Sequence, residues 1–418
     1  MKPEWLQCVS CNARYPVDVV RYTCDCGALL AVERDAAVLR ALTPAFFDAR
    51  LPARSGLDRS GVWRFREALL TVDPAHVVSL PEGNTRLYAH GRLAAFAGVD
   101  AVSFKHEGDN PTGSFKDRGM TLAMTAARML GASTVACAST GNTSASLAAY
   151  AAYAGMQAVV FVPSGKISLS KLAQTLAYGA RVLQVRGDFD AAMALVRQAC
   201  DALGIYLVNS VNPFRIEGQK TIGWELLADL GWNPPDWIVL PAGNLGNTSA
   251  VGKAMLEAHA AGWIPKVPHI LGVQARGANP FARSFATGFS RRETVKADTV
   301  ASAIRIGDPV SFDKARVVIE KTQGAVLDVS DDEILTAKRT LDRCGIGCEP
   351  ASAAALAGLK KARENGLVSR ESTVTCILTG HVLKDPDAVM LPVVGQALAG
   401  DQVVEVDATL DAVRAALR

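Results

Sequence analysis

One lysine in this sequence is placed where it could act as a nucleophile. Lys116 follows a loop of turn-forming residues (110–113) and stands where a helix is expected to begin. A lysine amine is a nucleophile only when it is neutral, and the positive end of a helix dipole disfavours its charge. Phe115 is apolar and helps to exclude water, and Ser114 and Asp117 are expected to cap the helix. These features favour a Schiff-base lysine over an ordinary surface lysine.

Two other loops could bind anions. Residues 139–146 (STGNTSAS) offer hydroxyls and backbone N–H groups at a helix start, in a run longer than a helix cap needs. Residues 241–249 (PAGNLGNTS) contain glycines that let the backbone approach a phosphate closely. No Gly-Lys-Ser/Thr follows and the Gly-x-Gly-x-x-Gly order is absent, so neither nucleotide motif is present. A compact monophosphate therefore fits better than a nucleotide.

Two further segments carry polar side chains that could have either of two roles. Arg215 could clamp a phosphate or carboxylate, or else Arg215 or Lys220 could pair with Glu217 at the surface. Thr379 could reach a ligand with its hydroxyl, or it could simply end a strand in a turn. We expect the neighbouring His381 to pack or hydrogen-bond locally.

Nine cysteines are present, and four of them gather near the N-terminus. Two close pairs with short strands between them predict a small zinc ribbon, in which thiolate ligation stabilises a unit too small for its own core. The second pair is Cys-x-Cys rather than Cys-x-x-Cys, so a degenerate ribbon without metal is the alternative. The four candidate ligands are Cys8, Cys11, Cys24 and Cys26. The others, expected to be buried free thiols, are Cys137, Cys200, Cys344, Cys348 and Cys376.

Composition narrows the class of protein. The chain has 418 residues, 49% of them apolar and 20% charged, which is typical of a soluble globular protein of several domains. The net charge of +3 argues against nucleic-acid binding. No apolar run reaches the roughly 20 residues of a membrane-spanning helix, and the first residues lack the order of a signal peptide. We therefore expect a cytoplasmic protein.

The polar loops need elements to position them. Short β-branched runs alternate with amphipathic helices from residue 101 onward, which predicts parallel sheets covered on both faces, with ligands beyond the carboxyl ends of the strands. Residues 61–70 and 87–97 are also expected to be helical, and 276–313 should be an ordered excursion or a mobile lid. The expected strands are 101–104, 134–138, 158–162, 181–185, 206–208, 237–240, 270–273, 325–329 and 374–378. The expected helices between them include 120–130, 143–154, 170–178, 189–203, 247–260, 331–344 and 351–364.

Four segments together resemble a known family. "NPTGSFKDRG", "STGNTSAS", "PAGNLGN" and "LTGHVLKD" resemble, in their order, the fold type II pyridoxal-phosphate enzymes, the tryptophan synthase β-like group. The resemblance implies two doubly wound α/β domains with the cofactor in the cleft between them, plus a small N-terminal zinc-ribbon-like unit. The expected boundaries are 1–35 for that unit, 36–118 with 216–395 for the large cofactor-binding domain, 119–215 for the smaller domain, and 396–418 for a C-terminal tail.

The same resemblance implies roles for single residues. Lys116 would bind pyridoxal 5′-phosphate covalently and later move protons, Asn142 would bind the ring hydroxyl, and Thr379 would face the ring nitrogen. The cofactor phosphate would be held by Gly243, Asn244, Leu245, Gly246 and Asn247. The substrate would be held by Ser139, Thr140, Thr143, Asn209, Ser210 and Arg215.

The resemblance also implies an activity. It is strongest to members that convert O-phosphohomoserine and water to threonine and phosphate, by phosphate elimination followed by water addition, and it suggests a homodimer. One alternative is another enzyme of this fold, such as cysteate synthase, threonine dehydratase or a diaminopropionate lyase. An alternative of another class is a non-catalytic regulatory protein that keeps the fold, against which the intact Lys116 argues.

Overall fold

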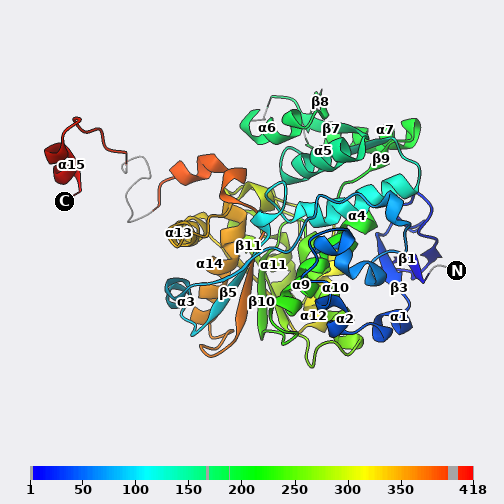
Figure 1. The fold of residues 1–418 in the computed structure, drawn as a ribbon, viewed down its shortest axis with the longest axis horizontal. Coiled ribbons are helices and arrows are strands. Elements are labelled where there is room, and N and C mark those ends of the chain that lie inside the picture. Colours follow the sequence, from blue (N-terminus) through cyan, green and yellow to red (C-terminus); the bar gives the residue numbers. More distant parts are fainter. Residues whose placement is uncertain (1–2, 166–168, 188, 394–402, 418) are drawn as a thin grey trace.

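The strands of the protein form three separate sheets. The computed structural model describes residues 3–165, 169–187, 189–393 and 403–417 (Figure 1). The N-terminal antiparallel sheet has the order β2-β1-β3, with β1 (Glu4–Cys8), β2 (Arg14–Tyr15) and β3 (Leu30–Arg34). The large sheet has the order β12-β11-β10-β13-β5-β4, with β4 (Leu87–Ala89), β5 (Val102–His106), β10 (Trp237–Pro241), β11 (His269–Ala275), β12 (Ala325–Val329) and β13 (Val374–Leu378). The smaller sheet has the order β8-β7-β6-β9, with β6 (Thr134–Ala138), β7 (Gln157–Pro163), β8 (Arg181–Val185) and β9 (Tyr206–Leu207).

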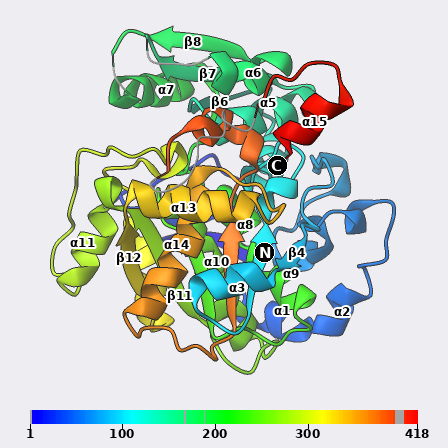
Figure 2. The ribbon, with the colours of Figure 1, turned by 90° about the vertical axis from the view of Figure 1, so that its left-hand side faces the viewer.

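Helices cover both faces of the two parallel sheets. In the large sheet, α14 packs on one face and α10 and α12 lie on the other, and Figure 2 shows α13 and α14 in front of the strands. In the smaller sheet, α5 and α7 both pack against β6 and β7. The helices that connect the strands are α3 (Gly91–Ala97), α4 (Lys116–Met129), α5 (Asn142–Ala154), α6 (Leu169–Ala177), α7 (Phe189–Leu203), α8 (Pro213–Gln219), α9 (Thr221–Asp229), α10 (Gly246–Ala260), α11 (Pro280–Ala286), α12 (Phe312–Lys321), α13 (Asp331–Asp342) and α14 (Pro350–Glu364). Near the termini lie α1 (Ala36–Ala41), α2 (Pro44–Asp48) and α15 (Leu410–Ala416).

The strand order brings the polar loops together. Strands β5, β13 and β10 are neighbours and run parallel, so the loops that follow them leave the large sheet at the same edge. These are the lysine loop, the loop at Thr379 and the glycine-rich loop at 241–247. Strands β6 and β9 are parallel neighbours in the smaller sheet, and they deliver the loops that begin at Ser139 and Asn209. Helix α4, which starts at Lys116, packs against both α5 and α8 and lies between the two sheets (Figure 1).

The α/β alternation expected from the sequence is confirmed, with two local corrections. The expected helix over 87–97 is wrong in its first part, because Leu87–Ala89 pairs antiparallel with β5 as an edge strand and α3 begins only at Gly91. Residues 61–70 form a short 3-10 segment, η2 (Trp63–Ala68), which is interrupted at Phe65. The consecutive residues Trp63, Arg64 and Phe65 of this segment are all buried. A surface helix buries only one stripe of side chains, so this burial does not fit the regular helix that the sequence predicted.

The long segment after β11 is an ordered excursion in the structure. Its backbone is held by hydrogen bonds from Val295 N to Gly307 O (3.0 Å) and from Asp298 N to Gly277 O (2.9 Å). The expected boundary between the large domain and the C-terminal tail, at 395/396, lies outside the described residues. Among the residues that the structure describes, no helix is long and apolar enough to cross a membrane.

Candidate active site

The lysine loop is locked to the end of strand β13. Phe115 N donates a hydrogen bond to Thr379 O (3.0 Å), and Ser114 forms an isolated bridge with Gly380. The expected capping by Ser114 is wrong: Phe115 occupies the N-cap position without a side-chain hydrogen bond, and Ser114 Oγ has no partner among the described residues. The bridge to Gly380 instead makes Ser114 part of the contact between the lysine loop and the loop that follows β13. Lys116 therefore stands beside Thr379, as the strand order requires.

The pKa of the Lys116 amine is shifted toward neutral pH. Its pKa is lowered to about 7, first by desolvation and then by the positive charge of Arg215, against a smaller opposing effect of Glu349. The helix dipole is not needed to explain the shift. Lys116 is only half-buried, and its Nζ lies 4.2 Å from the centre of the Phe115 ring. The amine is thus both poorly hydrated and accessible to a small molecule.

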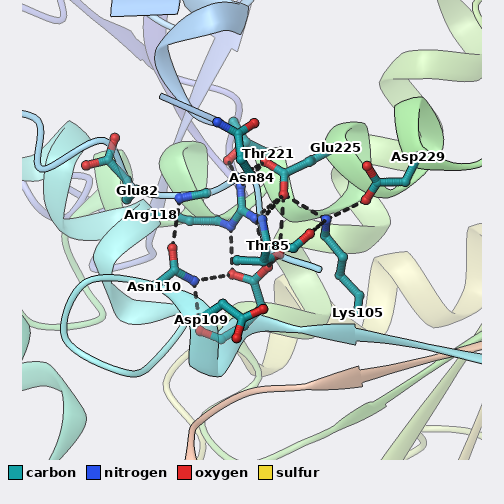
Figure 3. Close-up of polar contacts among 12 residues, drawn as sticks. Glu82, Asn84, Thr85, Lys105, Asp109, Asn110, Arg118, Thr221, Glu225 and Asp229 are labelled. Atoms are coloured by element: carbon teal, nitrogen blue, oxygen red, sulfur yellow. Dashed lines mark hydrogen bonds and ion pairs between the residues drawn. The ribbon is translucent and has the colours of Figure 1, made fainter. Parts of the chain in front are cut away.

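Arg118, two residues after the lysine, is the centre of a buried ionic network (Figure 3). Its Nε donates to Glu107 Oε2 (2.7 Å), and its Nη2 donates to Glu107 Oε1 and Glu225 Oε1 (both 2.8 Å). Lys105 Nζ lies 2.7 Å from Glu225 Oε1 and 2.5 Å from Asp229 Oδ2. Burial by itself would raise the pKa of Glu225, but Arg118 and Lys105 bring it well below its usual value.

The network continues into the turns on either side of the lysine loop. The backbone N–H groups of Asn84 and Thr85 donate to Glu225 (2.8 and 2.9 Å), and Gly83 N donates to Asn110 Oδ1 (2.9 Å). Asn110 in turn donates to Glu107 Oε2 (2.8 Å). The turn at 83–85, the loop before Lys116 and helix α9 are therefore fixed by one set of buried charges.

Asp117 ties the start of α4 to the helix that carries Asn142. Its carboxylate accepts hydrogen bonds from Thr112 N and Thr112 Oγ1 (both 2.7 Å) and from Ser146 Oγ (2.6 Å) on α5. Desolvation raises the pKa of Asp117 to about 6 despite these donors. The expected capping role of Asp117 is replaced by this cross-link between α4 and α5.

A carboxylate that the sequence did not suggest links the two expected ring contacts. Asn142 Nδ2 donates to Glu349 Oε2 (3.0 Å), and Thr379 Oγ1 lies 3.3 Å from Glu349 Oε1. Burial raises the pKa of Glu349, with Asn142 and Lys384 opposing the shift. Glu349 is 207 positions from Asn142, so no local pattern could have connected them. The only signal in the sequence is an acidic residue before Pro350 at an expected helix start.

The glycine-rich loop ends in a cradle of unpaired polar atoms. Leu245 adopts a left-handed conformation (φ 64°) that is uncommon for a non-glycine residue and turns the chain into the N-terminus of α10. A Cβ on Gly243 would lie 2.9 Å from Ile304 Cα, so only glycine fits there. Among the described residues, three buried side chains of this region have polar atoms without partners: Asn247 (Nδ2 and Oδ1), Thr248 (Oγ1) and Ser311 (Oγ).

This cradle fits the phosphate of pyridoxal phosphate. Buried donors without partners are costly, so their presence at a helix N-terminus points to an anion that they bind. The side chain of Asn244 is not one of these unpaired groups, because its Nδ2 donates to Ser210 Oγ (2.7 Å) and its Oδ1 accepts from Val310 N (2.7 Å). Thr248 and Ser311 were not expected from the sequence. Thr248 lies within the motif, whereas Ser311 comes from the excursion after β11.

Arg215 faces the lysine from helix α8. A Cβ on Gly119 would lie 2.9 Å from Arg215 Nε and a Cβ on Gly218 would lie 2.0 Å from Arg118 O, so two glycines allow α4 and α8 to meet. Arg215 Nη1 donates to Val208 O (2.7 Å), and Nε has no partner among the described residues. Burial lowers the pKa of Arg215 only to about 10, which leaves it charged at neutral pH.

The alternative role for Arg215 or Lys220, an ion pair with Glu217 at the surface, is not found in the structure. Lys220 does pair with Glu217, but both side chains are buried, with Lys253 also 3.0 Å from Glu217. No ion pair of Arg215 is found among the described residues. The guanidinium is thus a buried charge to which no carboxylate of the described residues is paired.

The other expected substrate residues lie at the loops after β6 and β9. Residues 139–143 are half-buried, and Ser139 Oγ accepts from Gly141 N (3.3 Å). Asn209 is engaged with the backbone, because its Oδ1 accepts from Ala138 N (2.9 Å) and its Nδ2 donates to Ala138 O (3.0 Å). Ser210 reaches the glycine-rich loop through Asn244. His381 accepts from Leu383 N (3.2 Å), the local role expected for it.

The four N-terminal cysteines converge on one point. Their sulfur atoms all lie within 4.8 Å of one another, with Cys8–Cys26 and Cys11–Cys24 at 3.5 Å. Four thiolates around a tetrahedral zinc ion, with Zn–S of about 2.3 Å, would be about 3.8 Å apart. The cluster therefore fits zinc. Of the other five cysteines, Cys344 is half-buried and the rest are buried, and all are free thiols as expected.

Comparison with known proteins agrees with this geometry. Residues 78–380 match the family model described as "Pyridoxal-phosphate dependent enzyme". The threonine synthase of Methanocaldococcus jannaschii is 46% identical over 91% of this chain and 93% of its own length. That of Methanosarcina acetivorans is 45% identical over 99% and 98%, and that of Mycobacterium tuberculosis is 47% identical over 78% and 89%.

Solved structures share the fold at lower identity. The processed form of threonine deaminase isoform 2 from Solanum lycopersicum has a TM-score of 0.63 at 23% identity, covering 73% of this chain and 87% of that one. Maize serine racemase has a TM-score of 0.62 at 23% identity, covering 72% and 88%. The chain belongs to the pyridoxal-phosphate dependent enzyme family and, within it, to the threonine synthases.

Proposed function

We propose that this protein converts O-phosphohomoserine and water to threonine and phosphate. The observation that carries the proposal is Arg215, a buried guanidinium beside Lys116 that has no carboxylate partner among the described residues. A phosphorylated substrate would supply the guanidinium with an anion. The relatives named threonine synthase match most of the chain, which supports the same reaction.

The cofactor would be held by residues on three loops. Asn247, Thr248 and the backbone of 243–247 would hold its phosphate, and Asn142 and Thr379 would contact its ring. Pyridoxal phosphate, when bound, draws electrons from the substrate carbons near the amine, so that protons can be removed there.

The chain itself would supply proton transfer and charge. Lys116, with a pKa of about 7, can accept a proton at neutral pH and return it later in the reaction. Arg215 and Ser210 would hold the substrate phosphate and balance the charge that develops as it leaves. Ser139, Thr140 and Thr143 would bind the carboxylate, since their loop is half-buried and opens a helix. Phe115 would limit the entry of water to the lysine side of the site.

The deciding experiment measures phosphate release. Wild-type protein loaded with pyridoxal phosphate should release phosphate from O-phosphohomoserine and form threonine, and it should be much less active on threonine, serine, or phosphoserine with sulfite. Lys116→Ala should abolish both turnover and the visible absorbance of the lysine-bound cofactor. Lys296→Ala, at an exposed position, is the matched control. Threonine formation by Lys116→Ala would refute the assignment.

Five broader features belong to the same proposal. The three sheets support the division into 1–35, 36–118 with 216–395, and 119–215, and the sulfur geometry supports a structural zinc. The free thiols and the biosynthetic names of the relatives support a cytoplasmic location. The family resemblance supports a homodimer, which sedimentation of the loaded protein would test. The modest net charge supports a small-molecule substrate over nucleic acid.

A further inference from the structure

Glu349 occupies a position from which it could control both ring contacts at once. It is the N-cap residue of α14, yet its side chain does not cap that helix. Glu349 is 4% exposed, and its carboxylate turns instead toward Asn142 and Thr379. A Cβ on Gly380 would lie 2.6 Å from Glu349 Oε1, so the loop after β13 can approach the carboxylate only because residue 380 is glycine.

The hydrogen bonds around Thr379 leave Glu349 as the acceptor within the protein for the Thr379 hydroxyl proton. Ser352 Oγ accepts from Thr379 N (2.8 Å) and Gly380 N (3.0 Å), so both of its lone pairs are used and Thr379 Oγ1, 2.9 Å away, cannot also donate to it. The Ser352 hydroxyl itself can donate to Thr379 Oγ1 or to the more distant Gly380 O (3.4 Å). Thr379 can then donate to Glu349 or toward the cofactor. An ionised Glu349 attracts that proton and leaves a lone pair of Thr379 facing the ring.

The same carboxylate decides how the Asn142 amide is turned. A carboxylate can only accept hydrogen bonds, so it holds Nδ2 of Asn142 toward itself and keeps Oδ1 away. A neutral carboxyl or amide in its place would accept either orientation. The charged groups that face Glu349 are Lys116 from α4 and Lys384 from the segment 382–384, and the Cys348 thiol is its neighbour in the chain.

We propose that Glu349 is a positioning residue whose charge sets the direction of the hydrogen bonds that Asn142 and Thr379 make with the bound cofactor. The inference rests on the proposed function, because that function places the cofactor against these two side chains. Glu349 acts through them and need not touch the substrate.

The test compares Glu349→Gln, which keeps the shape and removes the charge, with Glu364→Gln at the exposed far end of the same helix. The first readout is the affinity of cofactor-free protein for pyridoxal phosphate, from titration of protein fluorescence. The second is the visible spectrum of loaded, substrate-free protein as a function of pH. We expect Glu349→Gln to weaken cofactor binding about tenfold and to shift or remove the pH-dependent spectral change. Glu364→Gln should match wild type in both.

A double substitution separates this role from a merely structural one. Thr379→Val removes the hydroxyl and keeps the shape, so adding Glu349→Gln to it should change the spectrum less than Glu349→Gln does alone. Glu349→Asp covers the case in which the glutamine variant does not fold, and it should keep the pH dependence of wild type. Equal affinity and equal spectra for Glu349→Gln and wild type would overturn the inference. Wild-type protein that binds no cofactor would instead overturn the proposed function.

Discussion

At the scale of single residues, the site combines a lysine that loses its proton easily with a buried arginine, Arg215, that has no ion-pair partner among the described residues. Lys116 loses its proton easily because water is excluded and Arg215 repels a second positive charge. Arg215 remains charged because its pKa stays near 10. The positive charge of Arg215 thus disfavours the protonated form of Lys116, and an anionic group bound beside Arg215 would offset that charge.

The lowered pKa of Lys116 predicts its reactivity. In cofactor-free protein, competitive acetylation followed by mass spectrometry should show the reaction at Lys116 rising with pH through about 7 and levelling above that value. Exposed Lys296 serves as the internal reference in the same sample. Arg215→Gln removes the repulsion and should move the Lys116 curve to higher pH. A Lys116 curve that still climbs steeply above pH 9 would contradict the assigned environment.

The Arg215 guanidinium, which has no ion-pair partner among the described residues, predicts a loss of phosphate binding when it is removed. Arg215→Gln should raise KM for O-phosphohomoserine by about 30-fold or more, since truncating one partner of a buried charge pair costs roughly 2–5 kcal/mol. Inhibition by inorganic phosphate should weaken in parallel. Inhibition by homoserine, which lacks the phosphate, should change little. Equal losses for phosphate and homoserine would indicate a general disturbance of the site and remove Arg215 from phosphate binding.

At the scale of elements, the sequence predicted the loops that follow the strands better than the residues and strands that hold those loops in place. Lys116, Asn142, Gly243–Asn247 and Thr379 could be proposed from the sequence because each lies in or after a loop that follows a recognisable strand, and parallel strands bring such loops to one edge of a sheet. Glu349 could not be found, because its partners are distant in sequence and its helix start looks ordinary. Edge strand β4 was missed because its pairing with β5 outweighs a local helical pattern.

The ionic network around Arg118 was also beyond sequence reasoning, and it predicts a large stability effect. Glu225→Gln should lower the free energy of unfolding by about 3–5 kcal/mol, because it removes a charge from a buried pair and leaves Arg118 and Lys105 undercompensated. Glu320→Gln, in the exposed pair with Arg316, should cost at most about 1 kcal/mol. Urea unfolding monitored by circular dichroism measures both. Similar values for the two variants would contradict the central role of the network.

The same network predicts how stability depends on pH. The pKa of Glu225 lies well below its ordinary value in the folded state, so the folded state binds fewer protons than the unfolded state in acid. Its contribution is complete above the ordinary carboxyl pKa and is lost as the pH falls below it. The gap in unfolding free energy between wild type and Glu225→Gln should therefore narrow as the pH falls from about 5 toward 3. A gap of constant size over that range would contradict this explanation.

At the scale of the whole molecule, the N-terminal segment 3–35 contacts both the smaller sheet and the helices that cover the large sheet. Leu207 N, on β9 of the smaller sheet, donates to Tyr22 Oη (2.7 Å), and the Tyr22 and Tyr206 rings lie 5.7 Å apart. On the other side, Lys314 Nζ donates to Leu30 O (2.6 Å) and Lys253 Nζ donates to Val32 O. Strand β9 leads directly to Asn209 and Ser210. The cysteine cluster thus supports a unit that contacts strand β9 of the smaller sheet and the helices α10 and α12 that cover the large sheet.

Removal of the metal should therefore be felt at the substrate site. We expect about one zinc ion per chain by plasma mass spectrometry, and Cys24→Ser should lose it, with a lower melting temperature. Because the ribbon holds β9 through Tyr22, this variant should also raise KM for the phosphorylated substrate while binding pyridoxal phosphate as wild type does. Cys344→Ser, a half-buried cysteine outside the cluster, is the control. Wild-type protein without zinc, together with an unchanged melting temperature for Cys24→Ser, would show that the ribbon is degenerate and that its own packing holds it in place.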